Sequence, residues 1–330
     1  MTSPQSTAPE AFVTDIRVVG VGGGGGNVVR HVRRCGVSGV RLIAANTDQQ
    51  ALRGTGVERT ILLGPQTTRG RGAGSRLEVG QACAEESAGE IAAAVTGAAM
   101  VFIAAGLGGG TGTGASPVIA RLARAAGALT VAVVTLPFAF EGRRRARAAA
   151  EGLQRLEAAA DMVLVIPNDR LVQVSPKELS LLGAFAMADD VLRQIIQGIT
   201  DLVTRVGYIN VDFSDVCTVM ETPGGGVIGR GVGQGDERVR DAVRAALNHP
   251  LMGEADIRGA RGVLVHFTCG EALGLVELKE ALELVGEQAG DGTNLIFGAS
   301  LDQALGETVN VLLIATGVAN PFGARPAGKS

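Results

Sequence analysis

Two glycine-rich segments hold the residues of this chain whose types and spacing could bind a charged ligand. Residues 20–27 (GVGGGGGN) follow the apolar run 16–19, and residues 106–114 (GLGGGTGTG) follow the apolar run 100–103. Glycine lets a backbone turn tightly and approach an anion, and free amides at the start of a following helix donate to that anion. Each segment therefore predicts a phosphate-binding loop, and two loops at one sheet edge indicate a polyphosphate.

The first segment taken alone has another interpretation. Gly20, Gly22 and Gly25 fit the GxGxxG pattern of a dinucleotide-binding loop, which on its own is a weak signal. A nicotinamide-dependent oxidoreductase would explain this loop but would leave the second one unused. The threonines of the second loop stand where a P-loop has lysine, so charge neutralisation is expected from helix ends and Mg²⁺.

The elements that must position these loops alternate along the first half of the chain. Short apolar, β-branched runs are separated by helical patterns, and they lie at residues 16–19, 41–44, 100–103, 130–134 and 162–166. Such runs predict an α/β fold with a parallel sheet covered on both faces. We expect one helix to follow the first loop directly and another to open at Pro117.

The second half begins with a long helical pattern. Apolar residues keep a 3/4 spacing from about 178 to 205, which corresponds to about 42 Å of helix. A helical stretch at 236–248 and strand candidates at 263–268, 295–300 and 309–315 follow, and they indicate a smaller α+β unit with a mixed sheet.

These patterns divide the chain into five expected parts. They are a disordered N-terminal extension (1–12), a nucleotide-binding domain (13–177), a central connecting helix (178–206), a C-terminal domain (207–318) and a short tail (319–330).

Composition excludes several classes of protein. The 30 Lys and Arg residues against 33 Asp and Glu give a net charge of −3, which argues against nucleic-acid binding. The sequence contains no run of about 18 apolar residues, so we expect no membrane insertion. The four cysteines are too widely spaced for a metal or redox motif and the three histidines stand apart, so we expect no metal-binding cluster and a cytoplasmic chain.

Polar residues follow other predicted strands at the same edge of the sheet. They include Asn46, the triplet 143–145 (RRR), and Asn168 with Asp169. A carboxylate accepts hydrogen bonds from the N1–H and amine of guanine, and an amide can pair with its acceptors. The alternative for Asn168 and Asp169 is an ordinary turn, and for the arginines a solvated helix start.

Taken together, these motifs resemble one family. The glycine loops, the segments 46–48 (NTD), 72–74 (GAG), 140–145 (FEGRRR), 166–169 (IPND) and 210–216 (NVDFSDV) follow the order and spacing of the tubulin/FtsZ family from about residue 16 to 318. The sequence GGGTGTG is a signature of that family.

The resemblance implies a GTPase that binds GTP or GDP with Mg²⁺ and assembles head to tail into protofilaments. Phosphates would lie on both glycine loops, ribose near Glu141 and Arg145, and guanine between Asn168, Phe185 and Asp189, with core packing the alternative for Phe185. The nucleotide site implied by the resemblance comprises Gly22, Gly23, Gly24, Gly25, Gly26, Asn27, Asn46, Gly72, Ala73, Gly74, Gly108, Gly109, Gly110, Thr111, Gly112, Glu141, Arg145, Asn168, Phe185 and Asp189.

The catalytic residues implied by the resemblance lie after the long helix. Asn210, Asp212 and Asp215 would enter the pocket of the next subunit, where paired carboxylates can orient water. Without the resemblance, Asp212 and Asp215 predict a helix N-cap and a first-turn acid.

The resemblance also implies partners, and the chain departs from the family pattern at its end. The expected partner is a second copy, and a full-length family member is another. Family members continue into a linker and a terminal peptide that binds membrane tethers; about a dozen residues follow Val318 here, so we do not expect recruitment by those tethers. Ser75, Arg76 and Leu77 replace the usual residues beside a phosphate loop, which would alter turnover.

The resulting hypothesis is a polymerising GTPase of bacterial cell division, acting in the cytoplasm at the midcell ring. The alternative is a tailless paralogue that co-polymerises with a full-length relative or forms a weakly hydrolysing structural filament.

Overall fold

The computed structural model describes residues 14–173, 178–204, 207, 209–222, 224–252, 257–270 and 273–318. The expected extension at 1–12 and tail at 319–330 lie outside these residues. The helices are α1 (Gly22–Arg34), α2 (Gln49–Arg53), α3 (Leu77–Glu86), α4 (Ala88–Val95), α5 (Thr111–Ala125), α6 (Arg143–Glu157), α7 (Asn168–Gln173), α8 (Leu181–Thr204), α9 (Phe213–Met220), α10 (Arg238–Leu247) and α11 (Leu275–Ala289).

Within the described residues, ten strands form one sheet in the order β3-β2-β1-β4-β5-β6-β7-β10-β8-β9. The strands are β1 (Ile16–Val21), β2 (Val40–Asn46), β3 (Arg59–Leu62), β4 (Met100–Gly106), β5 (Leu129–Leu136), β6 (Met162–Pro167), β7 (Gly225–Gly233), β8 (Gly262–Cys269), β9 (Asn294–Leu301) and β10 (Val309–Val318). The first six are parallel, whereas β10 runs antiparallel to β7 and β8, so the predicted parallel and mixed sheets are confirmed.

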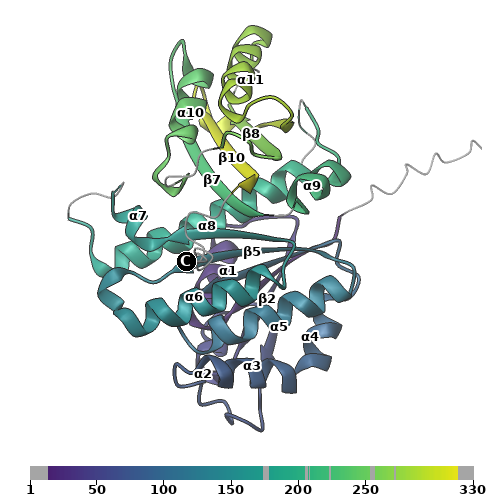
Figure 1. Ribbon diagram of the computed structural model, residues 1–330, viewed down its shortest axis with the longest axis vertical. Coiled ribbons are helices and arrows are strands. Elements are labelled where there is room, and N and C mark those ends of the chain that lie inside the picture. Colours follow the sequence, from purple (N-terminus) through teal and green to yellow (C-terminus); the bar gives the residue numbers. More distant parts are fainter. Residues whose placement is uncertain are drawn as a thin grey trace, which may run out of the picture.

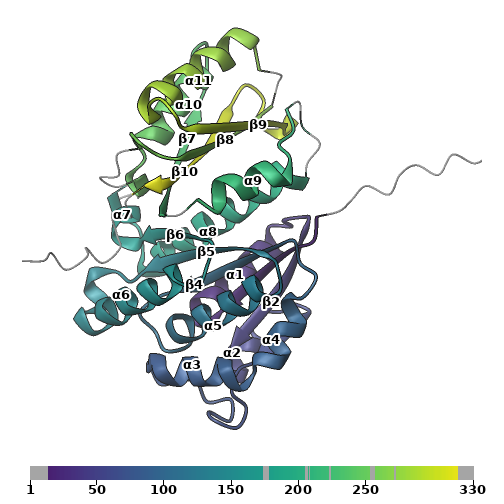
Figure 2. The same cartoon turned by 45° about the vertical axis from the view of Figure 1, so that its right-hand side comes forward.

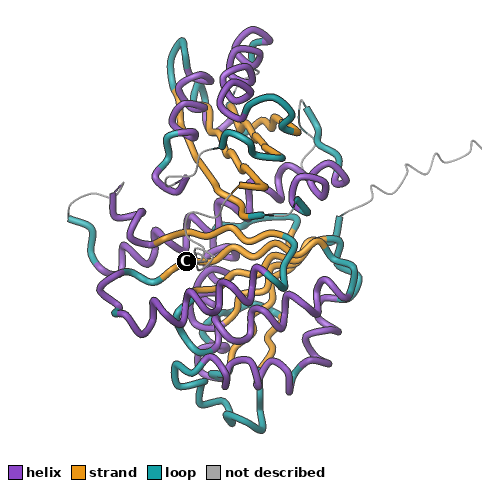
Figure 3. The backbone as a smooth tube through the Cα atoms, in the orientation of Figure 1, coloured by secondary structure: helices purple, strands orange, loops and turns teal. Residues whose placement is uncertain are grey.

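Helices cover both faces of the parallel part, and strands lie between helical layers (Figure 3). Successive residues of β4 enter opposite cores: Phe102 packs with α1 and α8, whereas Ile103 packs with α4, α5 and α6. This alternation follows from the pleat of a strand, and it explains the continuous apolar run in the sequence.

The two halves of the sheet meet at a narrow junction. A single residue pair, Leu164 and Gly226, joins β6 to β7. Across this junction α8 packs against Leu164 on one side and against Leu264 and Ile314 on the other. The views in Figures 1 and 2 place α8 between the lower, N-terminal elements and the upper group of β7–β10, α10 and α11.

Three local predictions differ from the structure. The helix expected to open at Pro117 begins at Thr111, inside the second glycine loop, and α1 begins at Gly22, inside the first. The long helix spans Leu181–Thr204, slightly shorter than predicted. The strands β3 and β7 and the helix α11 were not predicted.

Candidate functional site

A cavity of about 330 Å³ lies at the carboxyl ends of the parallel strands. Gly106 ends β4, Thr135 lies near the end of β5, and Asn168 follows β6 directly. The lining consists of Gly23, Gly24, Asn27, Ser75, Gly106, Leu107, Gly109, Gly110, Thr111, Gly112, Thr135, Pro137, Glu141, Arg145, Asn168, Phe185, Ala188 and Asp189. This edge is where open α/β sheets bind ligands.

Two helices begin at this cavity with free amides. In the described residues, neither α1 nor α5 has a side chain that caps its first turn, and neither has an acidic residue there. The first N–H groups of a helix have no partner within the helix, and the helix dipole makes that end positive. Both helix starts can therefore donate hydrogen bonds to an anion in the cavity.

The glycines of α1 divide into two kinds. A Cβ at Gly25 would lie 2.2 Å from the carbonyl oxygen of Ala104, so α1 rests directly on β4 only because this residue has no side chain. A Cβ at Gly23 would meet nothing within 4 Å, and Gly23 lines the cavity. The sequence GGGGG thus combines close helix–strand packing with open backbone toward a ligand.

The second loop is held by threonines. The Thr113 hydroxyl accepts a hydrogen bond from the amide of Gly108 at 2.8 Å, and the Thr111 and Thr47 hydroxyls lie 2.7 Å apart. Because Thr113 is fully buried, its hydroxyl fixes the loop, whereas Thr111 lines the cavity. The two threonines therefore differ in what they can do: one shapes the loop and the other can meet a ligand.

Two polar side chains, Asn168 and Asp189, carry acceptor oxygens at the far wall. Asn168 is 4% exposed, and its Oδ1 has no hydrogen-bond partner among the described residues. A buried unpaired acceptor is costly, and a ligand that donates a hydrogen bond there would remove that cost. Burial raises the pKa of Asp189 to about 6, and the charges of His31 and Arg30 limit the rise.

An aromatic group adjoins these acceptors. Phe185 is 37% exposed, and its ring meets Phe138 edge-on, with centroids 5.4 Å apart. Phe138 in turn stacks on Phe140. Phe185 therefore packs on one side and lines the cavity on the other, and it offers a flat surface for a base.

Glu141 and Arg145 are engaged with each other. Glu141 Oε1 accepts from the Phe138 amide at 2.9 Å, and Oε2 accepts from Arg145. Both residues line the cavity, and in the structure they also hold the loop that carries Phe138 and Phe140. Asp169 holds the same loop by accepting from the Ala139 amide.

Several residues expected at the site lie behind the cavity wall. Gly22, Gly25 and Gly26 are buried in α1, and Gly108 packs against the backbone of Arg145. Asn46 is 6% exposed and accepts from the Asp48 amide.

The segment 72–74 is also outside the lining. The Gly72 amide donates to Thr47, and Ala73 packs against Gly110 at the start of α5. The neighbouring residue Ser75 does line the cavity, with a φ of 57° that side chains rarely adopt. Its place in the lining was not predicted, although the sequence singled it out as a departure.

The residues Asn210, Asp212 and Asp215 lie far from this cavity; we call residues 210–215 the acidic segment. Asp212 occupies the N-cap position of α9, and Asp215 lies in its first turn, as predicted from position alone. Both side chains are exposed, and within the described residues the Asp212 side chain makes no capping hydrogen bond. Asn210 accepts from the Gly207 amide at 2.7 Å.

The acidic segment lies at the opposite edge of the sheet. The pKa of the Cys217 thiol on α9 is raised by burial and, to a smaller extent, by the charges of Glu221 and Asp161. Asp161 directly precedes β6, so α9 lies near the amino end of that strand. Asn168 follows β6 at its other end. Figures 1 and 2 likewise show α7 and α9 on opposite sides of the molecule.

The described residues contain no group of three or more His, Cys, Asp or Glu side chains that could hold a metal ion. No helix in that part of the chain is both long and apolar enough to cross a membrane.

Comparison with known proteins identifies the family. Residues 15–176 match the model of the tubulin/FtsZ family GTPase domain, and residues 224–319 match that of the FtsZ family C-terminal domain. The chain is 47% identical over 303 residues to the cell division protein FtsZ of Wigglesworthia glossinidia brevipalpis, covering 92% of this chain and 79% of that protein.

Solved structures agree with this match. The FtsZ of M. jannaschii, solved as an empty dimer, superposes with a TM-score of 0.87 at 44% identity, over 92% of this chain and 88% of that one. CetZ2 from Haloferax volcanii, in a GTPγS-bound protofilament, shares the fold with a TM-score of 0.80 at 23% identity, over 93% and 94% of the two chains. Since both domain models match in order along the chain and the match to a curated relative spans nearly all of it, the chain belongs to the tubulin/FtsZ family of GTPases.

Proposed function

We propose that the chain binds GTP in the cavity at the carboxyl edge of its sheet, and that the acidic segment of a second copy completes the hydrolytic site. The proposal depends chiefly on one observation: the cavity and the exposed acidic segment occupy opposite edges of the same sheet. Copies joined head to tail would bring the two together.

Guanine fits the acceptors of the far wall. Its N1–H and exocyclic amine are donors, and the unpaired Oδ1 of Asn168 and the carboxylate of Asp189 are acceptors. Adenine presents an acceptor at N1 and would leave one of these groups unsatisfied. Phe185 would lie against the base.

The phosphates would accept hydrogen bonds from the amides of Gly23, Gly24 and Gly109–Gly112 at the two helix starts. Cationic side chains contribute little there, because among the described residues Arg145 is the only one in the lining and it pairs with Glu141. The charge of a bound triphosphate would therefore need Mg²⁺, which binds phosphates and water with few protein ligands. The hydroxyl oxygen of Thr111 could bind that ion, and the ion would neutralise part of the phosphate charge.

We infer that the acidic segment acts on the cavity of another copy and not on its own. Asp189 lines the cavity from the first half of α8, and the helix continues for 15 residues after it, about 22 Å, before the chain reaches the acidic segment. In a second copy, the exposed Asp212 and Asp215 would instead orient and polarise the attacking water at the γ-phosphate.

The relatives support assembly and a role in division. The M. jannaschii FtsZ was solved as a dimer and CetZ2 as a protofilament, and the Wigglesworthia relative is a cell division protein. We propose that this chain forms head-to-tail protofilaments with itself as partner and acts at the division ring.

Mixing two inactive variants tests the shared site. Asp212→Ala keeps an intact cavity, and Asn168→Ala with Asp189→Ala keeps an intact acidic segment. We expect each variant alone to hydrolyse GTP poorly and an equimolar mixture to regain activity, because one kind of junction pairs an intact cavity with an intact segment.

The matched control mixes Asp212→Ala with a variant that carries all three substitutions. That mixture has no junction with two intact halves and should stay inactive. If the GTPase activity of the first mixture is no higher than that expected from its two variants measured separately, the shared site is contradicted.

A further inference from the structure

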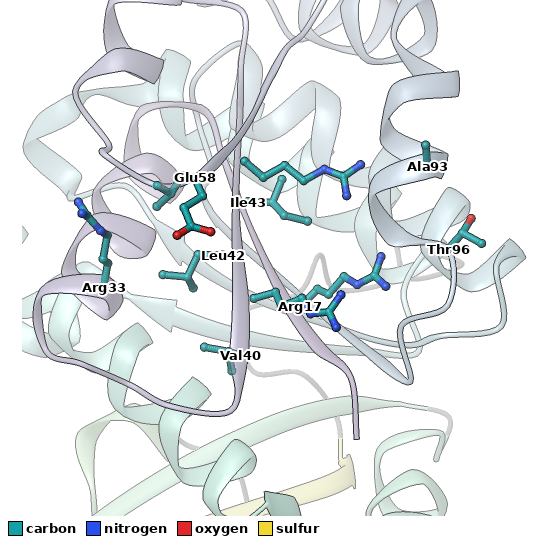
Figure 4. A pocket seen from close by; sticks show the side chains of 11 residues that line it. Arg17, Arg33, Val40, Leu42, Ile43, Glu58, Ala93 and Thr96 are labelled. Carbon is teal, nitrogen blue, oxygen red and sulfur yellow. The ribbon is translucent and has the colours of Figure 1, made fainter. Parts of the chain in front are cut away.

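A second cavity, of about 560 Å³, lies away from the nucleotide site and next to the edge strand β3. Its lining comprises Arg17, Arg33, Val40, Arg41, Leu42, Ile43, Val57, Glu58, Arg59, Ala93 and Thr96. In Figure 4, Ala93 on α4 and Thr96 directly after that helix lie across this cavity from Leu42 and Ile43, and Arg33 and Glu58 lie at its other end. We call it the arginine cavity.

The cavity exists because β3 is shorter than β2. Residue pairing between them begins at Ile43 and Arg59, so Val40–Leu42 extend beyond the end of β3. The chain reaches β3 through Val57 and Glu58, which line the cavity and have no pairing partner in β2 among the described residues. The end of α4 closes the gap from one face of the sheet.

Three of the arginines lie on one face of three neighbouring strands. Arg17 and Arg41 are direct partners in the register of β1 and β2. Arg59 pairs with Ile43, which lies two residues from Arg41 and hence on the same face. Like charges directly opposite one another on a sheet destabilise it, so this arrangement favours an anion between them.

The compensating carboxylates are too few. Asp15 binds Arg17 at 2.7 Å and lies 3.6 Å from Arg41. Glu58 lines the cavity, and neither Arg33 nor Arg59 forms an ion pair within the described residues. Four guanidinium groups against two carboxylates leave a surplus of two positive charges.

Apart from Thr96, the other described lining residues are apolar. Ile43 and Ala93 supply hydrocarbon surface on the face that carries the three strand arginines, whereas Val40, Leu42 and Val57 supply it on the opposite face. The volume is that of a site for a small organic molecule. Planar guanidinium forks match the oxygens of phosphate and carboxylate groups.

We propose that the arginine cavity binds a small organic dianion, in which a doubly charged oxyanion is attached to an apolar body. A phosphomonoester and a dicarboxylate share this chemistry. This site is separate from the nucleotide cavity and goes beyond the proposed function.

Calorimetric titration of the whole chain saturated with GDP tests the proposal. Phenyl phosphate is the probe, phthalate represents a dicarboxylate, and benzyl alcohol is the neutral match. We expect phenyl phosphate or phthalate to bind and benzyl alcohol not to bind; whichever anion binds more tightly identifies the source of the charge. Equal binding of benzyl alcohol, or no binding of either anion, would overturn the proposal.

Paired variants locate the binding. Arg41→Ala with Arg59→Ala should weaken binding of the anion at least about tenfold, since two charge-assisted contacts are lost. Arg53→Ala with Arg121→Ala removes the same charge from exposed positions outside the cavity and should leave affinity unchanged. Equal losses in the two double variants would show general charge attraction and contradict the site.

Glu58→Gln provides a test of opposite sign. It removes a carboxylate from the lining and should tighten binding by about threefold, because a repulsive charge is lost. This variant keeps the proposal testable even if the double variant folds poorly, and unchanged or weaker binding by Glu58→Gln would count against the site. GTP turnover of these variants should match the unmodified chain, which separates this site from the nucleotide site.

Discussion

The cavity and the acidic segment are built in contrasting ways. The cavity consists largely of backbone at helix starts, fixed by buried threonines and by glycines that permit close packing. The acidic segment presents exposed carboxylates at the start of a short helix. One region is enclosed and rigidly supported, whereas the other faces solvent.

This difference fits the different tasks that the proposed function gives to the two regions. Recognition of a nucleotide needs many fixed donors and acceptors around the ligand, and one chain supplies them. In the proposed function, the carboxylates act on water beside the ligand of another copy, and their exposure at the opposite edge would give them that access. The experiments below change one region while leaving the other intact.

The largest effect is expected for Asp212→Ala. GTP turnover should fall at least about a hundredfold, because a group that orients water is lost, while GTP affinity stays within a few-fold. Turnover assays at several protein concentrations and binding of a fluorescent GTP analogue measure the two quantities. Ser214→Ala, on the same exposed turn, is the matched control and should retain turnover. Lost affinity for GTP in Asp212→Ala would mean that the residue acts within its own chain.

A comparison of two glycines in α1 should show that this helix serves both packing and binding. Gly25→Ala places a Cβ 2.2 Å from the Ala104 carbonyl and should lower the free energy of unfolding by about 3 kcal/mol. Gly23→Ala meets no atom within 4 Å, so stability should stay within about 1 kcal/mol while GTP affinity falls. Thermal unfolding and nucleotide titration separate the two outcomes. Equal destabilisation by both substitutions would contradict this division of roles.

Acidification should weaken GTP binding through Asp189. Its pKa is raised to about 6 by burial, so the carboxylate that accepts from guanine is lost as pH falls through 6. Affinity should fall by up to about tenfold per pH unit below that value, since one proton is linked to binding. Asp189→Asn should bind more weakly at pH 7 and show little dependence on pH between 5 and 7. A dependence that persists in this variant would assign the titration to another group.

The Asp189 contribution to the free energy of unfolding of the ligand-free chain should change in the opposite direction and increase as the pH falls. A carboxyl group whose pKa is higher in the folded than in the unfolded state favours folding when it is protonated. The Asp189 contribution is therefore largest below its unfolded value near 3.8 and is lost as pH rises through about 6. In denaturant titrations, Asp189→Asn should remove this part of the pH dependence.

The smallest effect is expected at Ser75. Its positive φ costs free energy that glycine would not, so Ser75→Gly should stabilise the fold by about 0.5 kcal/mol. Ser75 also lines the cavity, so turnover should change modestly. Chemical denaturation measures the first effect, and Ser75→Ala, which keeps the Cβ, is the control. Equal stability in the glycine and alanine variants would show that the backbone strain is negligible.

Much of the nucleotide-binding half could be predicted from the sequence. Apolar strands with helices between them leave few topologies, and glycine loops after two strands mark the ligand edge. The structure brings Asn27, Asn168, Phe185 and Asp189 together with both loops around one cavity.

The strand β7 shows why other parts could not be predicted. Five of the nine residues of its sequence, GGVIGRGVG, are glycine, which is depleted in strands and hides the signal of its Val and Ile residues. A Cβ at Gly229, Gly231 or Gly233 would lie 1.8–2.0 Å from carbonyl oxygens of α10. The glycines are there because a helix packs directly on the strand, and that contact is invisible until the partner is known.

The site shows the same limit. Asn46 ends β2 and the segment 72–74 comes after β3 in the chain, as expected for residues at the ligand edge. Their polar groups bond to neighbouring loop residues, so they hold these loops and do not line the cavity. Thr135 completes the lining although it belongs to no recognisable motif. Which residue of a loop faces the ligand depends on its turn, and spacing along the chain does not specify that.

The unlike edges of the sheet also give any head-to-tail assembly a direction. One end of such a polymer would display an empty cavity and the other an unused acidic segment, so the two ends would exchange subunits at different rates. A copy with a blocked cavity could still join through its acidic segment, and it would then terminate growth at that end alone. Small amounts of such a copy would shorten polymers far more than their share of the mixture suggests.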